Sequence, residues 1–393
     1  MRMKFENAAK IAMLAVFSMV FPFLTGCWSN RDLTEINIVT ALGVDSSEDG
    51  KVVVTVQVAE PAAIQSTASA KGKGGGAQAK PVFVESYEGE TIFDALRSML
   101  SIVDKKLFLG TVQVLILGRG LSENGINKAL DFFQRDHEVE YDTVDVLIAK
   151  NVPPKDLLEI ETDMDPIPAM YIKKTAKNTV LQAKGKRTLL IDLIKDMGES
   201  GKQIVIGQIA KAGEKEVRTE GAAVFRDGKL AGWLDPYETQ GYLFAAGKLE
   251  SAVVNVPAAN AKISVEVIRS KGKVNVEFEN GEPAVLTIRV NLEANMEEYE
   301  GKGKLDSPDD LHKLEKILGE EVEREIRMAS NKAQKDYSSD IFGFGTQVHK
   351  YHPHYWKKVK DDWNDIFSKL PVDIKVDAKI KRTGVIKGPI KRD

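Results

Sequence analysis

Hydrophobic and polar residues follow two different periods along the first half of the chain. Runs rich in β-branched and apolar residues predict strands at residues 38–44, 52–59, 82–87, 112–117 and 144–149. Apolar positions spaced three and four apart predict helices at residues 92–103, 124–134, 154–160, 169–180 and 188–197. Thr91 and Ser122 are suited to cap two of these helices, because their hydroxyls can accept a free backbone N–H. Strands that alternate with helices indicate a mixed α/β domain over residues 27–200.

Strands dominate the second half. The turn dipeptide Asp227-Gly228 predicts a hairpin of residues 221–225 and 229–234, after a strand at 203–209. Further strands are predicted at residues 248–256, 262–268, 273–279 and 285–294, with Lys271-Gly272 and Asn280-Gly281 as turns. These segments predict an antiparallel sheet, which needs a cover on at least one face. Ser307 and Pro308 start a long amphipathic helix that can supply the cover, and strict alternation predicts a last strand at 372–380.

The predicted fold class is therefore α+β, with mixed and antiparallel sheets packed by helices. We expect three domains: a mixed α/β domain at 27–200, a strand-rich middle domain at 201–260, and an antiparallel sheet with a long helix at 261–393. Residues 61–81 are rich in Ala, Gly, Ser and Lys and predict a flexible surface loop within the first domain.

The N-terminal segment has the pattern of a secretory signal. Basic residues precede a short apolar run at 11–23, which is too short for a spanning helix of roughly 20 residues. The run ends in Leu24-Thr25-Gly26-Cys27, which resembles the lipobox of bacterial lipoproteins. This resemblance implies that residues 1–26 are removed and that Cys27 carries S-diacylglycerol and an N-acyl chain. Several acyl chains give the stable membrane residence that one chain does not.

Composition narrows the choice of partners and chemistry. Cys27 is the only cysteine among the 393 residues, so an internal disulfide and a cysteine-rich metal site are excluded. A formal net charge of −3 and a pI near 6.1 argue against nucleic acid as a partner.

The strongest candidate for chemistry is the group His349, His352 and His354, since converging imidazoles bind zinc or copper. Pro353 interrupts their spacing, so a solvated loop-to-helix junction is favoured over a metal site. Asp163 and Asp165 favour a helix-capping role over a cation site. Gly118 and Gly120 follow a strand, but the spacing of a dinucleotide fingerprint fails. Hydrolase motifs are missing from the sequence as well, so we expect neither an enzyme nor a cofactor.

Three short motifs resemble the Ger(x)C family, the lipoprotein C subunits of spore germinant receptors. The first is Cys27-Trp28 followed by Arg31-Asp32-Leu33 and a strand that ends in Gly43-Val44-Asp45. The second is the hairpin at 221–234, followed by Glu238-Thr239. The third is Asp340-Ile341-Phe342-Gly343-Phe344-Gly345.

The resemblance implies a non-catalytic, lipid-anchored subunit needed for receptor assembly or signalling during spore germination. It also implies two partners, a polytopic transporter-like subunit and a second membrane subunit with large soluble domains. The expected location is the outer face of the spore's inner membrane. An alternative stays open: a solute-binding lipoprotein could capture a small nutrient itself, in a cleft between domains.

Overall fold

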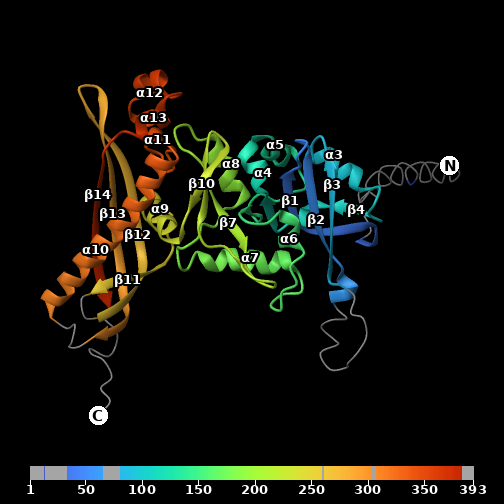
Figure 1. Cartoon of the computed structure of the whole chain (residues 1–393), viewed down its shortest axis with the longest axis horizontal. Coiled ribbons are helices and arrows are strands. Elements are labelled where there is room, and N and C mark those ends of the chain that lie inside the picture. The colour runs from blue at the N-terminus through green and yellow to red at the C-terminus, as the bar shows by residue number, and fades with distance from the viewer. Residues whose placement is uncertain (1–12, 14–32, 65–79, 259–260, 302–306, 383–393) are drawn as a thin grey trace, which may run out of the picture.

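A computed structural model describes residue 13 and residues 33–64, 80–258, 261–301 and 307–382. The described residues form two sheets that follow one another along the longest axis of the molecule (Figure 1). The signal segment, most of the predicted loop at 61–81 and the C-terminal tail lie outside the described residues.

The first sheet has ten strands in the described chain, with the main order β10-β9-β7-β6-β5-β1-β2-β3. Its strands are β1 (Ile36–Ser46), β2 (Val52–Ala59), β3 (Val82–Gly89), β4 (Lys106–Phe108), β5 (Val114–Leu117), β6 (Asp145–Ala149), β7 (Val205–Lys211), β8 (Val217–Arg218), β9 (Ala222–Arg226) and β10 (Lys229–Leu234). The central strands β1, β5, β6 and β7 are parallel, and antiparallel strands flank them on both sides. Every residue of β5 and β6 is buried, as the continuous apolar runs in the sequence predict.

Helices cover both faces of this sheet because its central strands send successive side chains to opposite sides. Leu115 and Leu117 pack with α3 (Ile92–Met99), α5 (Asn127–Arg135) and α8 (Leu190–Gly198) on one face. Val114 and Ile116 pack with α6 (Pro154–Leu158) and α7 (Pro168–Thr179) on the other. The remaining helical segments of this half are η2 (Leu33–Glu35), η3 (Leu109–Thr111) and α4 (Arg119–Asn124).

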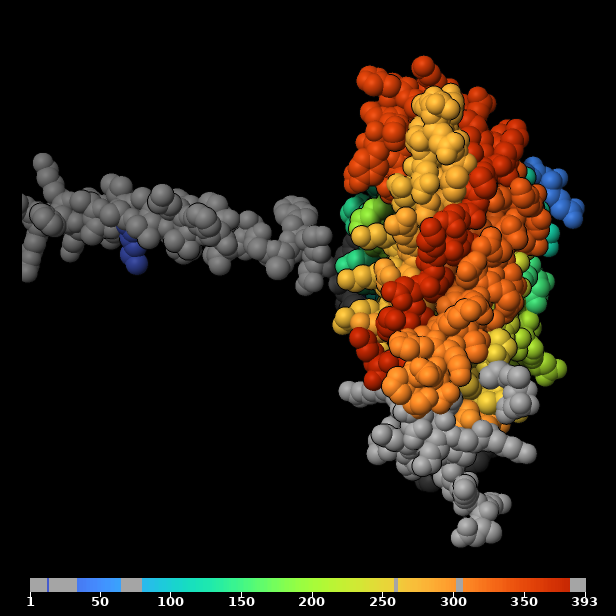
Figure 2. All heavy atoms as spheres, turned by 90° about the vertical axis from the view of Figure 1, so that its left-hand side faces the viewer, coloured from blue at the N-terminus to red at the C-terminus, as the bar shows by residue number. Residues whose placement is uncertain are grey.

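The second sheet consists of β11 (Ala252–Ala258), β12 (Ala261–Glu279), β13 (Glu282–Gly301) and β14 (Val372–Arg382) in this order. Its helices are α9 (Pro236–Ala246), α10 (Pro308–Asn331), α11 (Phe344–Tyr351), α12 (Pro353–Val359) and α13 (Trp363–Phe367), with the π-helical turn η4 (Lys332–Asp336) after α10. Figure 2 shows α10 lying across the end of the molecule beside β14, while the β12–β13 hairpin reaches up to the C-terminal helices.

The strands of residues 201–260 are shared between the two sheets. β7, β9 and β10 extend the first sheet, whereas β11 begins the second. Alternate residues of β9 even belong to different cores: Ala223 and Phe225 face the core under α8, and Val224 faces the core of the second sheet. The mixed α/β fold class is confirmed, and the three-domain division, which strand pairing does not define, stays a prediction.

Three local predictions were wrong. Helix α4 begins at Arg119, and Ser122 lies inside it with its hydroxyl donating to the Gly118 carbonyl at 2.7 Å. Lys271-Gly272 is not a turn but the middle of the long strand β12, where Gly272 lets the carbonyls of Phe244 and Ala245 approach the strand. The second sheet is not wholly antiparallel either, because β14 pairs with β13 in parallel.

Candidate functional site

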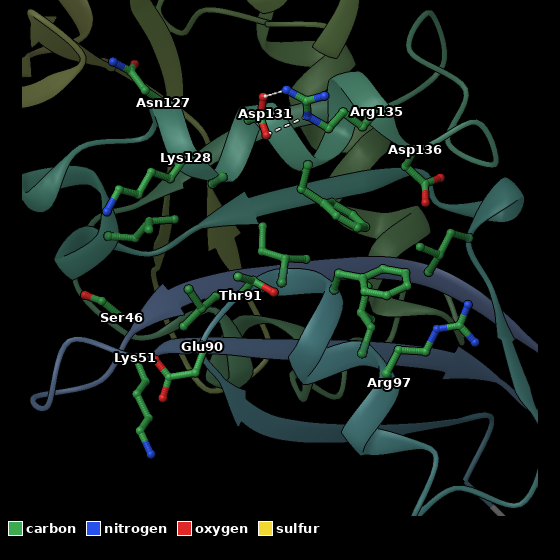
Figure 3. Close-up of a pocket in the computed structure, with 18 of the residues that line it drawn as sticks. Ser46, Lys51, Glu90, Thr91, Arg97, Asn127, Lys128, Asp131, Arg135 and Asp136 are labelled. Carbon is green, nitrogen blue, oxygen red and sulfur yellow. Dashed lines mark hydrogen bonds and ion pairs between the residues drawn. The ribbon is translucent and has the colours of Figure 1, made fainter.

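A large groove lies between α3 and α5, beside the turn that joins β1 to β2. Its volume is about 1020 Å³ (Figure 3). Apolar side chains of both helices and of the segment around β4 line it, among them Ile92, Leu96, Leu107 and Phe132. A concave surface of this size with an apolar lining is the usual form of a ligand or peptide site.

Charged side chains surround the groove, and several of them pair with each other. Arg135 binds both carboxylate oxygens of Asp131, at 2.9 and 3.0 Å, as Figure 3 shows. Hydrogen bonding from Arg135 lowers the pKa of Asp131. Lys106 pairs with Glu138 at 3.2 Å, and the Arg97 guanidinium lies 4.9 Å from the centre of the Phe93 ring. The groove can therefore bind an apolar or amphipathic molecule, and its paired carboxylates suit positioning better than acid–base chemistry.

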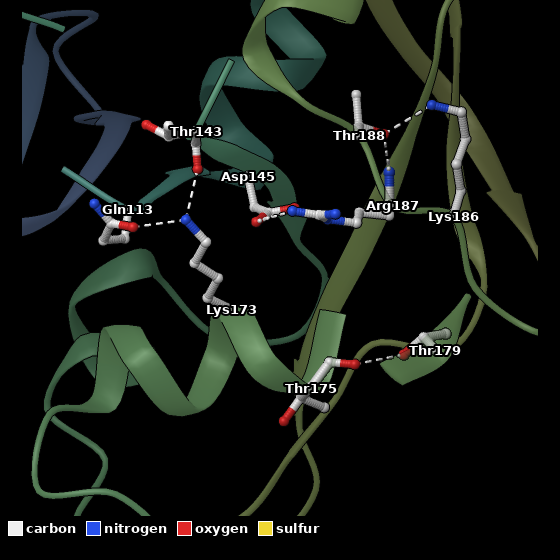
Figure 4. A network of polar contacts seen from close by, with 10 residues as sticks. Gln113, Thr143, Asp145, Lys173, Thr175, Thr179, Lys186, Arg187 and Thr188 are labelled. Carbon is white, nitrogen blue, oxygen red and sulfur yellow. Dashed lines mark hydrogen bonds and ion pairs between the residues drawn. The ribbon is translucent and has the colours of Figure 1, made fainter. Parts of the chain in front are cut away.

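A polar network runs through the other side of the first sheet (Figure 4). Lys173 donates to the side chain of Gln113 at 2.6 Å and to the Thr143 carbonyl at 2.7 Å, and burial lowers its pKa. Arg187 holds the buried carboxylate of Asp145 with two bonds, of 2.6 and 3.1 Å. These groups are satisfied within the fold, so the network positions α7 and the segment before α8 on the sheet.

Lys186 is the most perturbed base in the described chain. Its ammonium donates to the Thr188 hydroxyl at 2.8 Å, and the residue is only 6% exposed. Burial lowers its pKa to about 7, and the nearby charge of Lys248 acts in the same direction. A polar cavity of about 270 Å³ lies beside it, lined also by Asp192 and Glu250. Among the described residues, Lys186 forms no ion pair with Asp192 or Glu250.

A buried carboxylate organises the segment that follows α10. Asp340 is fully buried, and its two oxygens accept the backbone N–H groups of Gly343 at 2.9 Å, Phe344 at 3.2 Å and Gly345 at 2.7 Å. The indole N–H of Trp363 is the fourth donor, at 2.8 Å. Burial raises the pKa of Asp340, and these four donors oppose that shift. This explains the spacing in the third motif, because the carboxylate holds the turn that starts α11.

The same segment joins the two halves of the molecule, and we call residues 337–346 the junction segment. The Tyr337 hydroxyl accepts the N–H of Trp233 at 3.0 Å and donates to its carbonyl at 2.8 Å. The Ser339 hydroxyl donates to the Phe225 carbonyl at 2.7 Å. Gly232 leaves the space that the Tyr337 ring occupies. Tyr337 and Ser339, which directly precede the third motif, are therefore in contact with the second motif, more than a hundred residues earlier in the chain.

The three candidate histidines do not converge. The His349 ring stacks on Trp356 with centroids 5.7 Å apart, and the His352 ring stacks on Phe278 at 3.8 Å. His354 is exposed on α12. Across the described ranges, no three side chains of His, Cys, Asp or Glu gather as metal ligands would. Two of these residues therefore pack against aromatic side chains near the β12–β13 hairpin.

The acidic pair before α7 has separate roles. Asp165 accepts the N–H of Ile167 at 3.0 Å, next to the start of the helix, and pairs with Lys174 at 2.7 Å. Asp163 pairs with Lys215 at 2.8 Å instead.

The predicted lipidation site lies outside the described residues, as do all of Leu24, Thr25, Gly26 and Cys27. Within the described ranges, no helix combines the length and apolar character needed to cross a bilayer.

Sequence reasoning missed the groove, Lys186 and the role of Asp340. The groove is formed by elements that are distant in the sequence and adjacent only in the folded protein. A single buried lysine produces no recognisable sequence pattern. The Asp340 turn did leave a signal, since an Asp three residues before a Gly suits a side chain that caps its own backbone.

Comparison with known proteins gave matches along nearly the whole chain. The model of a spore germination protein N-terminal domain matches residues 29–211, and that of a spore germination B3/GerAC-like C-terminal domain matches residues 220–384. Spore germination protein KC of Bacillus subtilis (strain 168) is 28% identical, covering 97% of each chain. Spore germination protein B3 of the same organism is 26% identical, covering 94% of this chain and 98% of the relative. The crystal structure of the GerBC protein has a TM-score of 0.54 at 22% identity and covers 86% of this chain and 96% of that one, which shows a shared fold.

Proposed function

Because this chain belongs to the Ger(x)C family of spore germination proteins, we propose that it is a lipid-anchored subunit of a spore nutrient germinant receptor. The family resemblance predicted from three motifs is thereby confirmed. The family is not enzymatic, in agreement with the prediction that this chain is not an enzyme.

One observation carries the proposal. The two family models together span residues 29 to 384 with a gap of only a few residues, and the curated relatives match over at least 94% of this chain. The likeness therefore concerns the whole subunit and not one shared module. The hydrogen bonds that Tyr337 and Ser339, just before the third motif, form with Trp233 and Phe225 of the second motif hold the two halves in one arrangement.

The membrane anchor is the acylated Cys27. The lipobox residues Leu24, Thr25 and Gly26 precede it, and diacylglycerol with an N-acyl chain supplies enough buried methylene groups for stable residence. The proposed site is the outer face of the spore's inner membrane. There the tether raises the local concentration of the folded body, so that modest contacts suffice for assembly with a polytopic subunit and a second membrane subunit.

The test is Cys27→Ala, made in the sporulating organism and compared with Trp28→Ala, which keeps the cysteine. Membrane fractionation, mass spectrometry of the N-terminal peptide and co-purification of the other subunits are measured together. We expect acylation and membrane retention in the parent and in Trp28→Ala, and loss of both in Cys27→Ala. An unacylated parent protein refutes the anchor. Spores that lack the whole chain yet germinate normally with every nutrient refute the receptor role.

The groove between α3 and α5 supports a second candidate function, capture of a small nutrient by this chain itself. Calorimetry of the purified lipoprotein, without other subunits, tests it with amino acids and sugars. Saturable binding that Lys128→Glu at the groove abolishes, and that Lys316→Glu on α10 leaves intact, favours capture. If none of these solutes gives a measurable heat of binding, nutrient capture is contradicted and assembly of the receptor remains the proposed function.

A further inference from the structure

Three exposed apolar side chains lie within ten residues of one another, on α3 and just after it. Phe93 is 55% exposed, Leu100 is 37% exposed and Ile102 is 54% exposed. Large hydrophobic side chains with this exposure are few in the described chain, and no other stretch of ten residues contains three of them. We call Phe93, Leu100 and Ile102 the tether-side patch. Single exposed apolar residues need no explanation, but a cluster of them does.

Helix geometry explains why these side chains point outward. Helix α3 buries four residues against the sheet, and these four make up its whole buried face: Ile92, Ala95, Leu96 and Met99. Phe93, Arg97 and Leu100 follow at spacings of four and three, so they share the side of the helix next to its buried face, where they also line the groove between α3 and α5. Nothing in the core requires an apolar residue at positions 93, 100 or 102.

The patch adjoins the point where the described chain begins. Thr34 and Glu35 line a shallow cavity together with Leu100, Lys105 and Lys106. The side chain of Asn37 on β1 donates to Asp104 and to the Lys105 carbonyl, both at 3.3 Å. In Figure 1, α3 and β4 lie toward one end of the long axis, and β14 lies at the other.

The length of the tether brings this end of the body close to the bilayer. Six residue steps separate Cys27 from Leu33 in the sequence. A fully extended chain of that length reaches about 20 Å. An acylated Cys27 therefore confines the patch to a thin layer above the headgroups. Arg97 and Lys105 lie beside the patch, and cations of this kind keep their charged ends at the phosphates while apolar neighbours enter the interface.

We propose that the tether-side patch rests in the membrane interface and orients the body, with the second sheet directed away from the bilayer. This inference rests on the proposed lipid anchor. The occupant of the patch is the lipid surface, and contact with another receptor subunit is the competing outcome.

The lone cysteine makes a clean experiment possible, since the sulfur of Cys27 is blocked by lipid in the processed protein. Ile102→Cys and, as the matched control, Tyr351→Cys each introduce one free thiol at a comparably exposed position, because Tyr351 is 60% exposed. Tyr351 is the last residue of α11, which lies in the other half of the molecule (Figure 1). Each thiol receives an environment-sensitive fluorophore. The full-length processed lipoprotein is then reconstituted alone in vesicles of phosphatidylethanolamine and phosphatidylglycerol that carry a nitroxide-labelled lipid.

We expect the lipid-borne nitroxide to quench the label at position 102 several-fold more than the label at 351, and aqueous iodide to show the reverse order. Phe93→Cys is a second reporter with the same expectation. Equal quenching at 102 and 351, in protein that is acylated and retained on the vesicles, overturns this inference and leaves the anchor intact. Protein that lacks acylation and washes off the vesicles overturns both. A label at 102 that becomes shielded only after the other subunits are added assigns the patch to a protein partner and also overturns the inference.

Discussion

Asp340→Asn is the most informative single change, because one carboxylate holds both the turn before α11 and the packing of Trp363. The substitution keeps the shape of the side chain and leaves one oxygen to accept from Gly343 and Phe344. The other oxygen, which accepts from Gly345 at 2.7 Å and from the Trp363 indole at 2.8 Å, becomes an NH₂ group that can only donate.

The expected cost follows from this geometry. Hydrogen bonds to a charged group each contribute about 1.5–3 kcal/mol, so the loss of two amounts to roughly 3–6 kcal/mol. Part of this is offset, since the neutral amide no longer carries the desolvation cost that raises the pKa of Asp340. We expect a net loss of about 2–4 kcal/mol, a large share of the roughly 5–15 kcal/mol that stabilises a typical domain.

Urea unfolding followed by tryptophan fluorescence measures the effect, because Trp356 and Trp363 lie in the same core with ring centroids 5.8 Å apart. The control is Asp365→Asn, which removes an exposed ion pair with Arg226 at 2.9 Å. We expect this control to cost less than about 1 kcal/mol. An Asp340→Asn protein whose unfolding free energy is within about 0.5 kcal/mol of the parent would refute the view that this carboxylate organises the junction segment.

Three further changes test buried features. Burial lowers the pKa of Lys186 from 10.5 to about 7. Between these two pH values the unfolded chain binds more protons than the folded protein, so the free energy of unfolding rises with pH by about 1.4 kcal/mol per pH unit. We expect Lys186→Met to remove this rise. Burial raises the pKa of Glu325 from 4.5 to about 8. Between these two pH values the folded protein binds more protons than the unfolded chain, so the free energy of unfolding falls as the pH rises. We expect Glu325→Gln to remove this fall. Gly272→Ala places a methyl group against the Phe244 and Ala245 carbonyls and lowers stability by about 2–4 kcal/mol.

Each of these changes has a matched control measured by the same urea titration. Lys195→Met alters an exposed lysine on α8 and keeps the rise above pH 7. Glu320→Gln alters an exposed glutamate on α10 and keeps the fall below pH 8. Gly198→Ala adds a methyl group where no atom lies within 4 Å, so its cost stays small. If the unfolding free energy of Lys186→Met or Glu325→Gln depends on pH in the same way as that of the parent, the explanation from that residue's pKa is contradicted. If Gly272→Ala is as stable as Gly198→Ala, the explanation from the close carbonyls is contradicted.

Local chemistry made much of the fold predictable. Thr91 caps α3 by accepting the N–H of Asp94 at 3.1 Å, and Ser307 caps α10 through the N–H of Asp310 at the same distance. Asn280 and Gly281 both have positive φ, 53° and 83°, as the tight turn between β12 and β13 requires. In each case the residues that produce the structure lie within a few positions of one another.

Features that depend on distant contacts could not be predicted from the sequence in this way. Gly272 resembles a turn residue until the end of α9 is placed against it. β14 pairs with β13 in parallel because the chain between these two strands includes α10, which packs over the sheet. The alternation of apolar and polar residues within a strand does not determine its direction. The groove likewise combines α3, α5 and the β1–β2 turn, none of which has an unusual sequence. The predicted lipidation site is the opposite case, since its motif is local and lies outside the described residues.

The junction segment also bears on how the two halves of the molecule can move relative to each other. Separate domains normally meet through small polar surfaces and move as hinges. Here Val205, Ala222, Val224 and Leu234 of the first sheet belong to the same core as the second sheet, and the N–H of Gln203 donates to the Asp340 carbonyl at 2.8 Å. Bending between the halves would therefore open a shared core. A tilt of the first sheet is consequently carried to the second sheet as a rigid movement of the whole body.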